Sequence, residues 1–66
     1  MQLLTLTLYA SNNRKVHVNA GYIESFLLSA DSSHTKLYMI GDIHNLHLVQ
    51  ETPEDIILAL CSLGVL

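Results

Sequence analysis

The sequence predicts an α+β fold: a small, mostly antiparallel sheet of about five short strands, forming an open sheet or partial barrel, with one C-terminal helix. Three observations predict this fold. Apolar and polar residues alternate with a period of two over residues 4–9 and 15–19, as they do in half-buried strands. Polar turns separate the strand-like segments. A helix start at residues 52–55 precedes apolar residues at helical spacing, and the 66 residues are expected to form one domain, 1–66.

The first two strands are predicted to form a hairpin. Residues 4–9 alternate leucine with threonine and tyrosine, and a polar turn follows at residues 11–14, where an asparagine can adopt the left-handed conformation. Residues 15–19 resume the alternation, so they pair naturally with the first strand. The two valines of this second strand then face one side and His17 faces the other.

The middle of the chain is less regular. Asn19-Ala20-Gly21 breaks the alternation, and residues 22–28 fit either a strand or a short helix on periodicity alone. Their aromatic and β-branched residues favour a strand. A polar loop, a strand, a Gly-Asp turn and a returning strand are expected next, at residues 30–34, 35–40, 41–42 and 46–50.

The C-terminal helix has the most legible start in the sequence. Thr52 is expected to cap it, Pro53 suits the first helical position, and Asp55 acts as a shorter capping-box acid. Glu51 precedes them and completes a helix-start motif whose role is structural. Beyond Asp55 the helix carries no charge, so we expect the sheet and a neighbouring subunit to cover it. The residues expected at that subunit interface are Ile57, Leu60 and Leu63.

Composition limits the possible functions. Apolar residues make up 50% of the chain and charged residues only 14%, which argues against disorder and leaves more apolar surface than a short monomer buries easily. We therefore expect a homo-oligomer. The net charge is -3 with only three basic residues, so the clustered lysines and arginines of a nucleic-acid-binding protein are missing and no nucleic-acid partner is expected.

The expected location is the cytoplasm. The first residues lack the basic segment of a signal peptide, and no stretch approaches the roughly 18 to 20 continuous apolar residues of a membrane span, so no membrane insertion is expected. The single cysteine, Cys61, cannot form an internal disulfide, which fits a reducing compartment. Because Cys61 lies in an apolar helical pattern, we expect a buried, inert thiol.

One stretch suggests metal chemistry. Gly-Asp-x-His at residues 41–44 is similar to the metal-binding loop of metallophosphoesterases, and His47 follows three residues after His44. Two-metal catalysis needs many ligands from separate loops, whereas this chain has no second Gly-Asp and no Gly-Asn-His. On a strand, His44 and His47 would also face opposite sides. We therefore predict a hairpin turn at Gly41-Asp42 and no catalytic residue, metal or cofactor.

Binding through strand side chains is the remaining possibility. Tyr38 alternates with Leu37 and Met39, so it occupies the opposite face of its strand. Tyrosine is enriched in interfaces, and the strand histidines are the other candidates. The predicted interaction surface consists of Tyr38, His47 and His17. A half-buried strand tyrosine without a binding role is the alternative.

Several segments follow the order found in a known family. They are Val16-His17-Val18-Asn19, Asn19 to Ile23, Thr35-Lys36-Leu37, Gly41 and Val49-Gln50-Glu51-Thr52-Pro53-Glu54-Asp55-Ile56. In this order the chain resembles the FlbD family, small bacterial proteins linked to flagella and swarming motility, with related short proteins on phages and plasmids. The resemblance covers residues 3–60. It implies the sheet-plus-helix fold and a non-enzymatic character, and it supplies no catalytic residues.

The leading hypothesis is a cytoplasmic, homo-oligomeric adaptor that is not an enzyme and acts by binding another protein. Its setting would be a flagellar accessory role or a mobile-element protein that modulates a host complex. The alternative is a small-molecule or nucleotide sponge with pockets between identical subunits. A metal-dependent hydrolase built on residues 41–47 is a third alternative.

Overall fold

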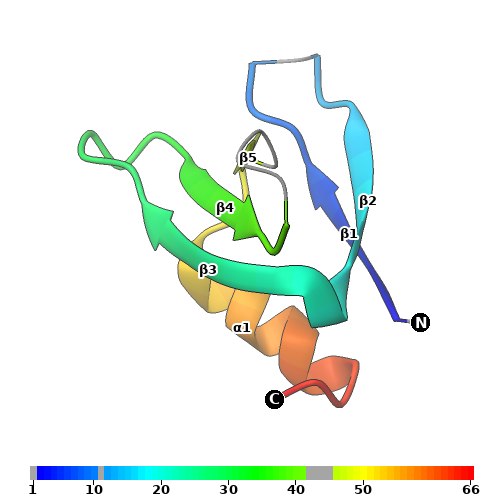
Figure 1. Cartoon of the computed structure of the whole chain (residues 1–66). Coiled ribbons are helices and arrows are strands. Elements are labelled where there is room, and N and C mark those ends of the chain that lie inside the picture. Colours follow the sequence, from blue (N-terminus) through cyan, green and yellow to red (C-terminus); the bar gives the residue numbers. More distant parts are fainter. Residues whose placement is uncertain (1, 11, 42–45) are drawn as a thin grey trace.

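The computed structural model describes residues 2–10, 12–41 and 46–66, which form five antiparallel strands in two open sheets and one helix near the C-terminus (Figure 1). The predicted α+β fold is confirmed. The elements are β1 (Leu3–Thr7), β2 (Lys15–Asn19), the 3-10 helix η1 (Ala20–Tyr22), β3 (Ile23–Leu28), β4 (Thr35–Met39), β5 (Leu46–Val49) and α1 (Pro53–Ser62). The first sheet pairs β1 with β2, and the second has the order β3-β4-β5.

The hairpin of β1 and β2 forms as the alternation predicts. Asn12 and Asn13 take positive φ angles of 54° and 60°, the left-handed conformation that short polar side chains tolerate. The backbone N–H of Leu8 donates to the carbonyl of Arg14 at 2.8 Å and closes the connection. On β2, His17 is exposed on the side opposite the valines.

The ambiguous middle segment is a short 3-10 turn followed by a strand. Asn19 ends β2 because its side-chain oxygen accepts a hydrogen bond from the Gly21 N–H at 3.0 Å and caps η1. β3 begins directly afterwards at Ile23, so strand is correct for most of residues 22–28. Its pairing with β4 shifts by one residue at Glu24, which forms a β-bulge.

The two sheets meet where β1 ends beside β5. Leu8 forms a bridge with Val49, the Tyr9 N–H donates to the Leu48 carbonyl at 2.8 Å, and the Gln50 N–H donates to the Thr7 carbonyl at 2.8 Å. The hairpin thereby continues the three-stranded sheet at its β5 side. Within the described ranges β1, β2, β3 and β5 each have one ladder partner, and the Leu8–Val49 bridge between β1 and β5 leaves β2 and β3 as the two outer edge strands.

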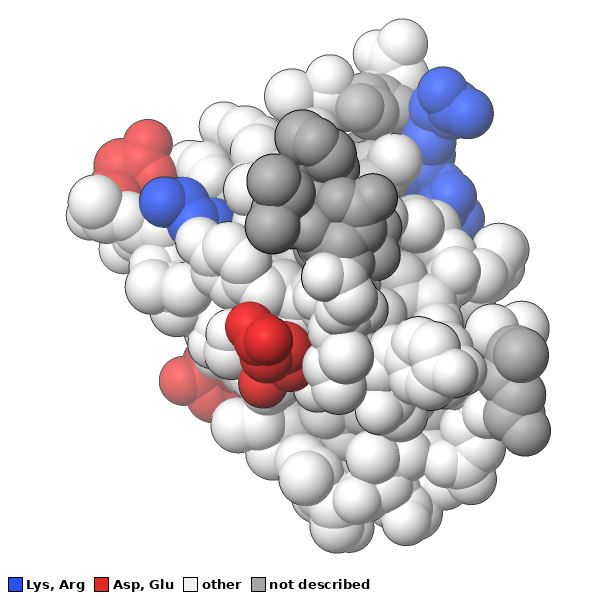
Figure 2. Space-filling view, in the orientation of Figure 1, with Lys and Arg blue, Asp and Glu red and all other residues white. Residues whose placement is uncertain are grey.

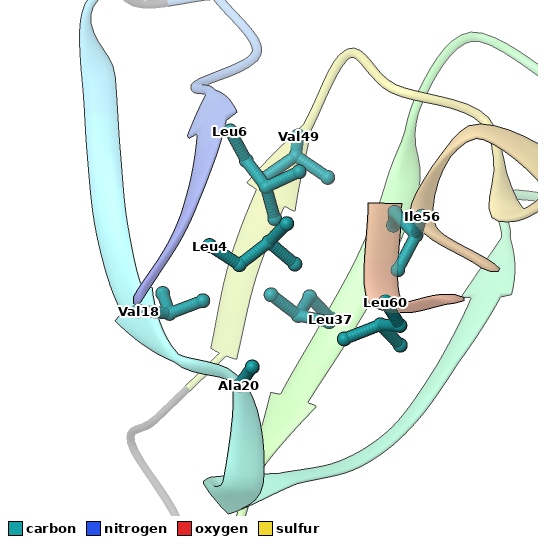
Figure 3. Close-up of a cluster of buried hydrophobic side chains, with 8 residues drawn as sticks. All are labelled: Leu4, Leu6, Val18, Ala20, Leu37, Val49, Ile56 and Leu60. Carbon is teal, nitrogen blue, oxygen red and sulfur yellow. The ribbon is translucent and has the colours of Figure 1, made fainter. Parts of the chain in front are cut away.

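The core lies between the hairpin, the second sheet and α1 (Figure 3). The helix contributes Ile56 and Leu60, which lie one turn apart and point toward Leu37 of β4. The hairpin contributes the inward residues of its alternating strands. The complete buried apolar cluster is Leu4, Leu6, Val18, Ala20, Leu37, Val49, Ile56 and Leu60.

The start of α1 has the predicted capping geometry. The Thr52 hydroxyl accepts the Asp55 N–H at 3.2 Å, and the Asp55 carboxylate accepts the Thr52 N–H at 3.2 Å. This reciprocal pair is a capping box, and Pro53 follows the cap as predicted. In the part of the chain that the structure describes, no helix is long and apolar enough to cross a membrane.

Candidate protein-interaction surface

The β3-β4-β5 sheet has one face turned away from the core. Residues paired across antiparallel strands share a face of the sheet, so the register assigns two rows of side chains to this side. One row pairs Leu27, Lys36 and Leu48, and the next pairs Ser25, Tyr38 and Leu46. We call this surface the outer sheet face, defined by Ser25, Leu27, Lys36, Tyr38, Leu46 and Leu48.

The leucines of the outer sheet face are exposed. Leu27 is 49% exposed, Leu46 is 43% exposed and Leu48 is 37% exposed. Antiparallel sheets with one face on the core commonly carry polar residues on the other. In β5 the two leucines point outward, while His47, opposite Leu37, and the buried Val49 lie on the core side. The sheet thus places apolar side chains where solvent would favour polar ones.

Tyr9 extends the outer sheet face beyond β5. Because Leu8 pairs with the buried Val49, Tyr9 falls on the opposite, outward side, next to Leu48. Its ring stacks on the imidazole of His34 with the ring centroids 4.5 Å apart and the planes 26° from parallel. An aromatic pair therefore closes one end of the exposed leucine surface.

The loop that carries His34 is held by short hydrogen bonds. The hydroxyls of Ser29 and Ser33 each donate to the Asp31 carboxylate at 2.7 Å, and the Ser33 N–H donates to it at 3.0 Å. The hydrogen bond from the Ser33 hydroxyl, followed by that from Ser29, lowers the pKa of Asp31 to about 2. The Ser33 hydroxyl also lies 2.7 Å from Nδ1 of His34. These contacts fix the stacked pair relative to β4.

Charge is sparse around this surface. Lys36 is the basic residue of the outer sheet face and stands between Leu27 and Leu48 in the register. In the orientation of Figure 2 most of the surface drawn is white, and therefore carries no charged side chain. The outer sheet face is therefore mainly apolar, with one positive charge at Lys36.

The predicted interaction residues do not form one surface. Tyr38 pairs with Leu46 and lies on the outer sheet face, whereas His47 pairs with Leu37 and lies on the other side of the sheet. The prediction that Tyr38 and His47 share a face is wrong, because strand register decides the face and the sequence does not reveal register. Both side chains are half-buried. His17 belongs to the hairpin, where its Nδ1 lies 2.9 Å from the Thr5 hydroxyl.

Glu51, predicted as part of the helix start, connects both sheets. Its carboxylate accepts the Thr7 N–H at 2.9 and 3.0 Å and the Thr7 hydroxyl at 3.0 Å. The Thr7 hydroxyl in turn accepts a hydrogen bond from Lys15 Nζ at 2.8 Å. The Glu51 carbonyl accepts the hydroxyl of the fully buried Thr35 at 2.6 Å. This residue is structural, as the sequence indicates, and its role extends beyond capping.

The residues predicted for a subunit interface on α1 are divided between core and surface. Leu60 is buried in the core of the chain itself and Leu63 packs partly against that core, so Leu60 is not available to a second subunit. Ile57 is exposed, together with its neighbour Leu58. Cys61 is also exposed, so the expected burial of its thiol is wrong. The helix turns one narrow side inward and leaves the rest uncovered.

The candidate metal loop lies mostly outside the described residues. Asp42 and His44 belong to residues 42–45, which the structure does not describe. Gly41 has a φ of 114°, the positive range that favours glycine in a turn. Elsewhere, in residues 2–10, 12–41 and 46–66, no group of three or more His, Cys, Asp or Glu side chains is placed to hold a metal ion. No pocket is found over the same residues.

Comparison with protein-family models, with curated proteins and with solved structures finds no match for this chain.

The sequence-based interpretation missed the exposed leucines. Leu46 and Leu48 follow the strand alternation, which identifies two sets of side chains and does not say which set is buried. Val49 could have indicated this exposure. It follows Leu48 directly, so both faces of β5 carry apolar residues. A strand that is apolar on both faces is typical of a sheet covered on both sides.

Proposed function

We propose that this chain is a non-enzymatic binding protein whose outer sheet face holds a protein partner. The observation that supports this most directly is the outward position of the β5 leucines, Leu46 and Leu48, beside Leu27. Contiguous exposed apolar patches on small proteins mark interaction sites. Tyr38 and Tyr9 add side chains of the type that is enriched at protein interfaces.

The chemistry of the outer sheet face defines the partner it suits. The centre of the surface is apolar, and Lys36 lies within it between two leucines. A complementary segment presents two or three apolar side chains with one carboxylate opposite Lys36, since an amine covered by a partner needs a charge or hydrogen-bond acceptor. We therefore propose an amphipathic, acidic segment of another protein as the bound element.

The biological setting rests on the FlbD resemblance. The segments that resemble that family favour a bacterial, cytoplasmic protein that is a flagellar or swarming-motility accessory, or a phage- or plasmid-borne relative that modulates a host complex. The single cysteine is compatible with a reducing compartment. In either setting the activity we propose is capture of a protein.

A comparison of matched variants tests the proposal. The wild-type chain, a Leu46→Ser/Leu48→Ser variant and an Ile57→Ser/Leu58→Ser control are immobilised and exposed to extract of the bacterial host, and retained proteins are identified by mass spectrometry. A partner is expected on the wild type and on the α1 control and to be absent from the β5 variant. Retention of the same proteins by all three chains contradicts the proposal. Native mass spectrometry that finds a co-purified small molecule instead supports the sponge alternative.

A further inference from the structure

Among the described strands, β2 and β3 lie at the outer edges, away from the contact between β1 and β5, and these two edges differ in how they are protected. Natural sheets protect free edges with lysine, proline, charge or short strands. β2 begins with Lys15 and exposes no large apolar side chain over its described length. β3 has neither lysine nor proline, and its one charge and its bulge both lie at Glu24, near its start. Beyond Glu24 it exposes Leu27 and Leu28, the latter by 41%. The apolar end of this edge is therefore a site for pairing with another strand.

The hydrogen-bond pattern shows which backbone groups of β3 point outward. The Ser29 N–H donates to the His34 carbonyl at 2.9 Å, in register with the β3–β4 ladder. Hydrogen-bonded and non-hydrogen-bonded pairs alternate along an antiparallel ladder. Leu27 is therefore hydrogen-bonded toward β4, while the N–H and C=O groups of Phe26 and Leu28 are directed away from β4, toward the open edge.

We propose that β3 pairs with β3 of a second copy of the chain about a two-fold axis centred on Leu27. A two-fold axis normal to the sheet keeps inner and outer faces matched, so residues that pair must share a face. When Phe26 of one copy pairs with Leu28 of the other, the two paired residues lie on the same face of the sheet. Their outward N–H and C=O groups then form hydrogen bonds between the two strands. Leu27 then lies opposite its own counterpart as a non-hydrogen-bonded pair on the outer side.

The alternative register places the axis at Phe26 and is less favourable. It sets Leu28 against Glu24, the bulged residue at which the β3 ladder is irregular. In the register centred on Leu27, Glu24 lies beyond the paired residues. The two Glu24 side chains are then separated by about six residues of strand, roughly 20 Å, which exceeds the screening distance of about 8 Å at physiological salt.

The second copy fits this edge better than an unrelated strand does. Isologous pairing covers both unprotected edges in one contact, because each copy brings the same open edge. It also places the two outer sheet faces on the same side of one continuous sheet. The dimer does not depend on the proposed partner, but it presents that partner with a surface of twice the width.

Cysteine cross-linking tests the register directly. In a Cys61→Ser background, Leu27→Cys places two thiols at a non-hydrogen-bonded pair, where the Cα atoms are about 4.5 Å apart and within the range that a disulfide spans. Leu48→Cys is the matched control, an exposed leucine of the same face two strands from the axis. Mild oxidation is expected to link Leu27→Cys nearly completely into a covalent dimer, and to leave Leu48→Cys without a covalent link on a denaturing, non-reducing gel. Equal linking of both variants, or none of Leu27→Cys, overturns the proposal.

Light scattering coupled to size exclusion supplies the second measurement. The wild-type chain and Leu48→Lys are expected to be dimers, and Leu27→Lys a monomer with an unchanged circular dichroism spectrum. A monomeric wild type, or equal masses for the two variants, overturns the dimer. If Leu27→Lys fails to fold, the cross-linking result decides. Leu48→Lys is expected to lose the partner and keep the dimer, so failure of this proposal and failure of the proposed function are distinguishable.

Discussion

Glu51 is the residue on which the two sheets depend most. Its carboxylate satisfies the N–H and hydroxyl of Thr7, which is buried, and its carbonyl satisfies the buried hydroxyl of Thr35. When a buried polar group loses its hydrogen-bond partner, no interaction offsets the free-energy cost of removing that group from water. Glu51 thereby joins β1 through its side chain and β4 through its backbone carbonyl, just before the start of α1.

Replacement of Glu51 by alanine is expected to destabilise the fold. Glu51→Ala leaves the Thr7 N–H and hydroxyl without their acceptor, at a cost of about 1–3 kcal/mol in the free energy of unfolding. Urea denaturation followed by circular dichroism measures the change. Glu24→Ala is the control, because Glu24 is exposed on the bulge and its loss is expected to stay within about 0.5 kcal/mol. Equal effects of the two substitutions would contradict this role for Glu51.

Asp31 is expected to titrate well below an ordinary aspartate. The serine hydroxyls lower its pKa from 3.8 to about 2 in the folded chain. Because the folded pKa is depressed, the contribution to stability is present above the unfolded pKa of about 3.9 and is lost as pH falls toward about 2. NMR titration of the Asp31 carboxyl carbon measures this pKa, and Ser33→Ala is expected to raise it. An ordinary value in the wild-type chain would show that the loop does not hold these hydrogen bonds in solution.

At the scale of elements, substitutions in β4 and β5 test which face of the second sheet is buried. Leu37→Ala removes a fully buried side chain and is expected to cost about 2–5 kcal/mol in the free energy of unfolding. Leu48→Ala removes an exposed one and is expected to change it by no more than about 0.5 kcal/mol. Chemical denaturation of both variants gives the comparison. A large loss on Leu48→Ala would mean that β5 turns its leucines inward.

The elements differ in how far the sequence determines them. The start of α1 was predictable because its signals are local: a capping threonine, a proline and an acid within four residues fix both position and direction. The hairpin was predictable from alternation and its asparagine turn. The face on which Tyr38 and His47 lie was not, because it depends on pairing between strands distant in the fold. The outer sheet face follows from that register, so it required the structure.

At the scale of the whole molecule, the chain leaves many of its large apolar side chains exposed. Among the described residues more large apolar side chains are exposed than are buried. A domain of this size buries a smaller fraction of its surface than a larger one, and its stability is correspondingly marginal. The exposed apolar side chains are thus distributed over several surfaces. The strand register identifies two of these surfaces, the β3 edge and the outer sheet face.

Association through β3 predicts that thermal stability depends on protein concentration. When folding is coupled to dimer formation, mass action raises the melting temperature as the chain becomes more concentrated. Over about a hundredfold range of concentration, the wild-type chain is expected to gain several degrees, and Leu48→Lys is expected to follow it. Leu27→Lys, with a charge at the proposed axis, is expected to melt at a lower temperature that does not change with concentration. Differential scanning fluorimetry across a dilution series makes the measurement, and a flat wild-type profile would show that the folded chain does not associate over this range of concentration.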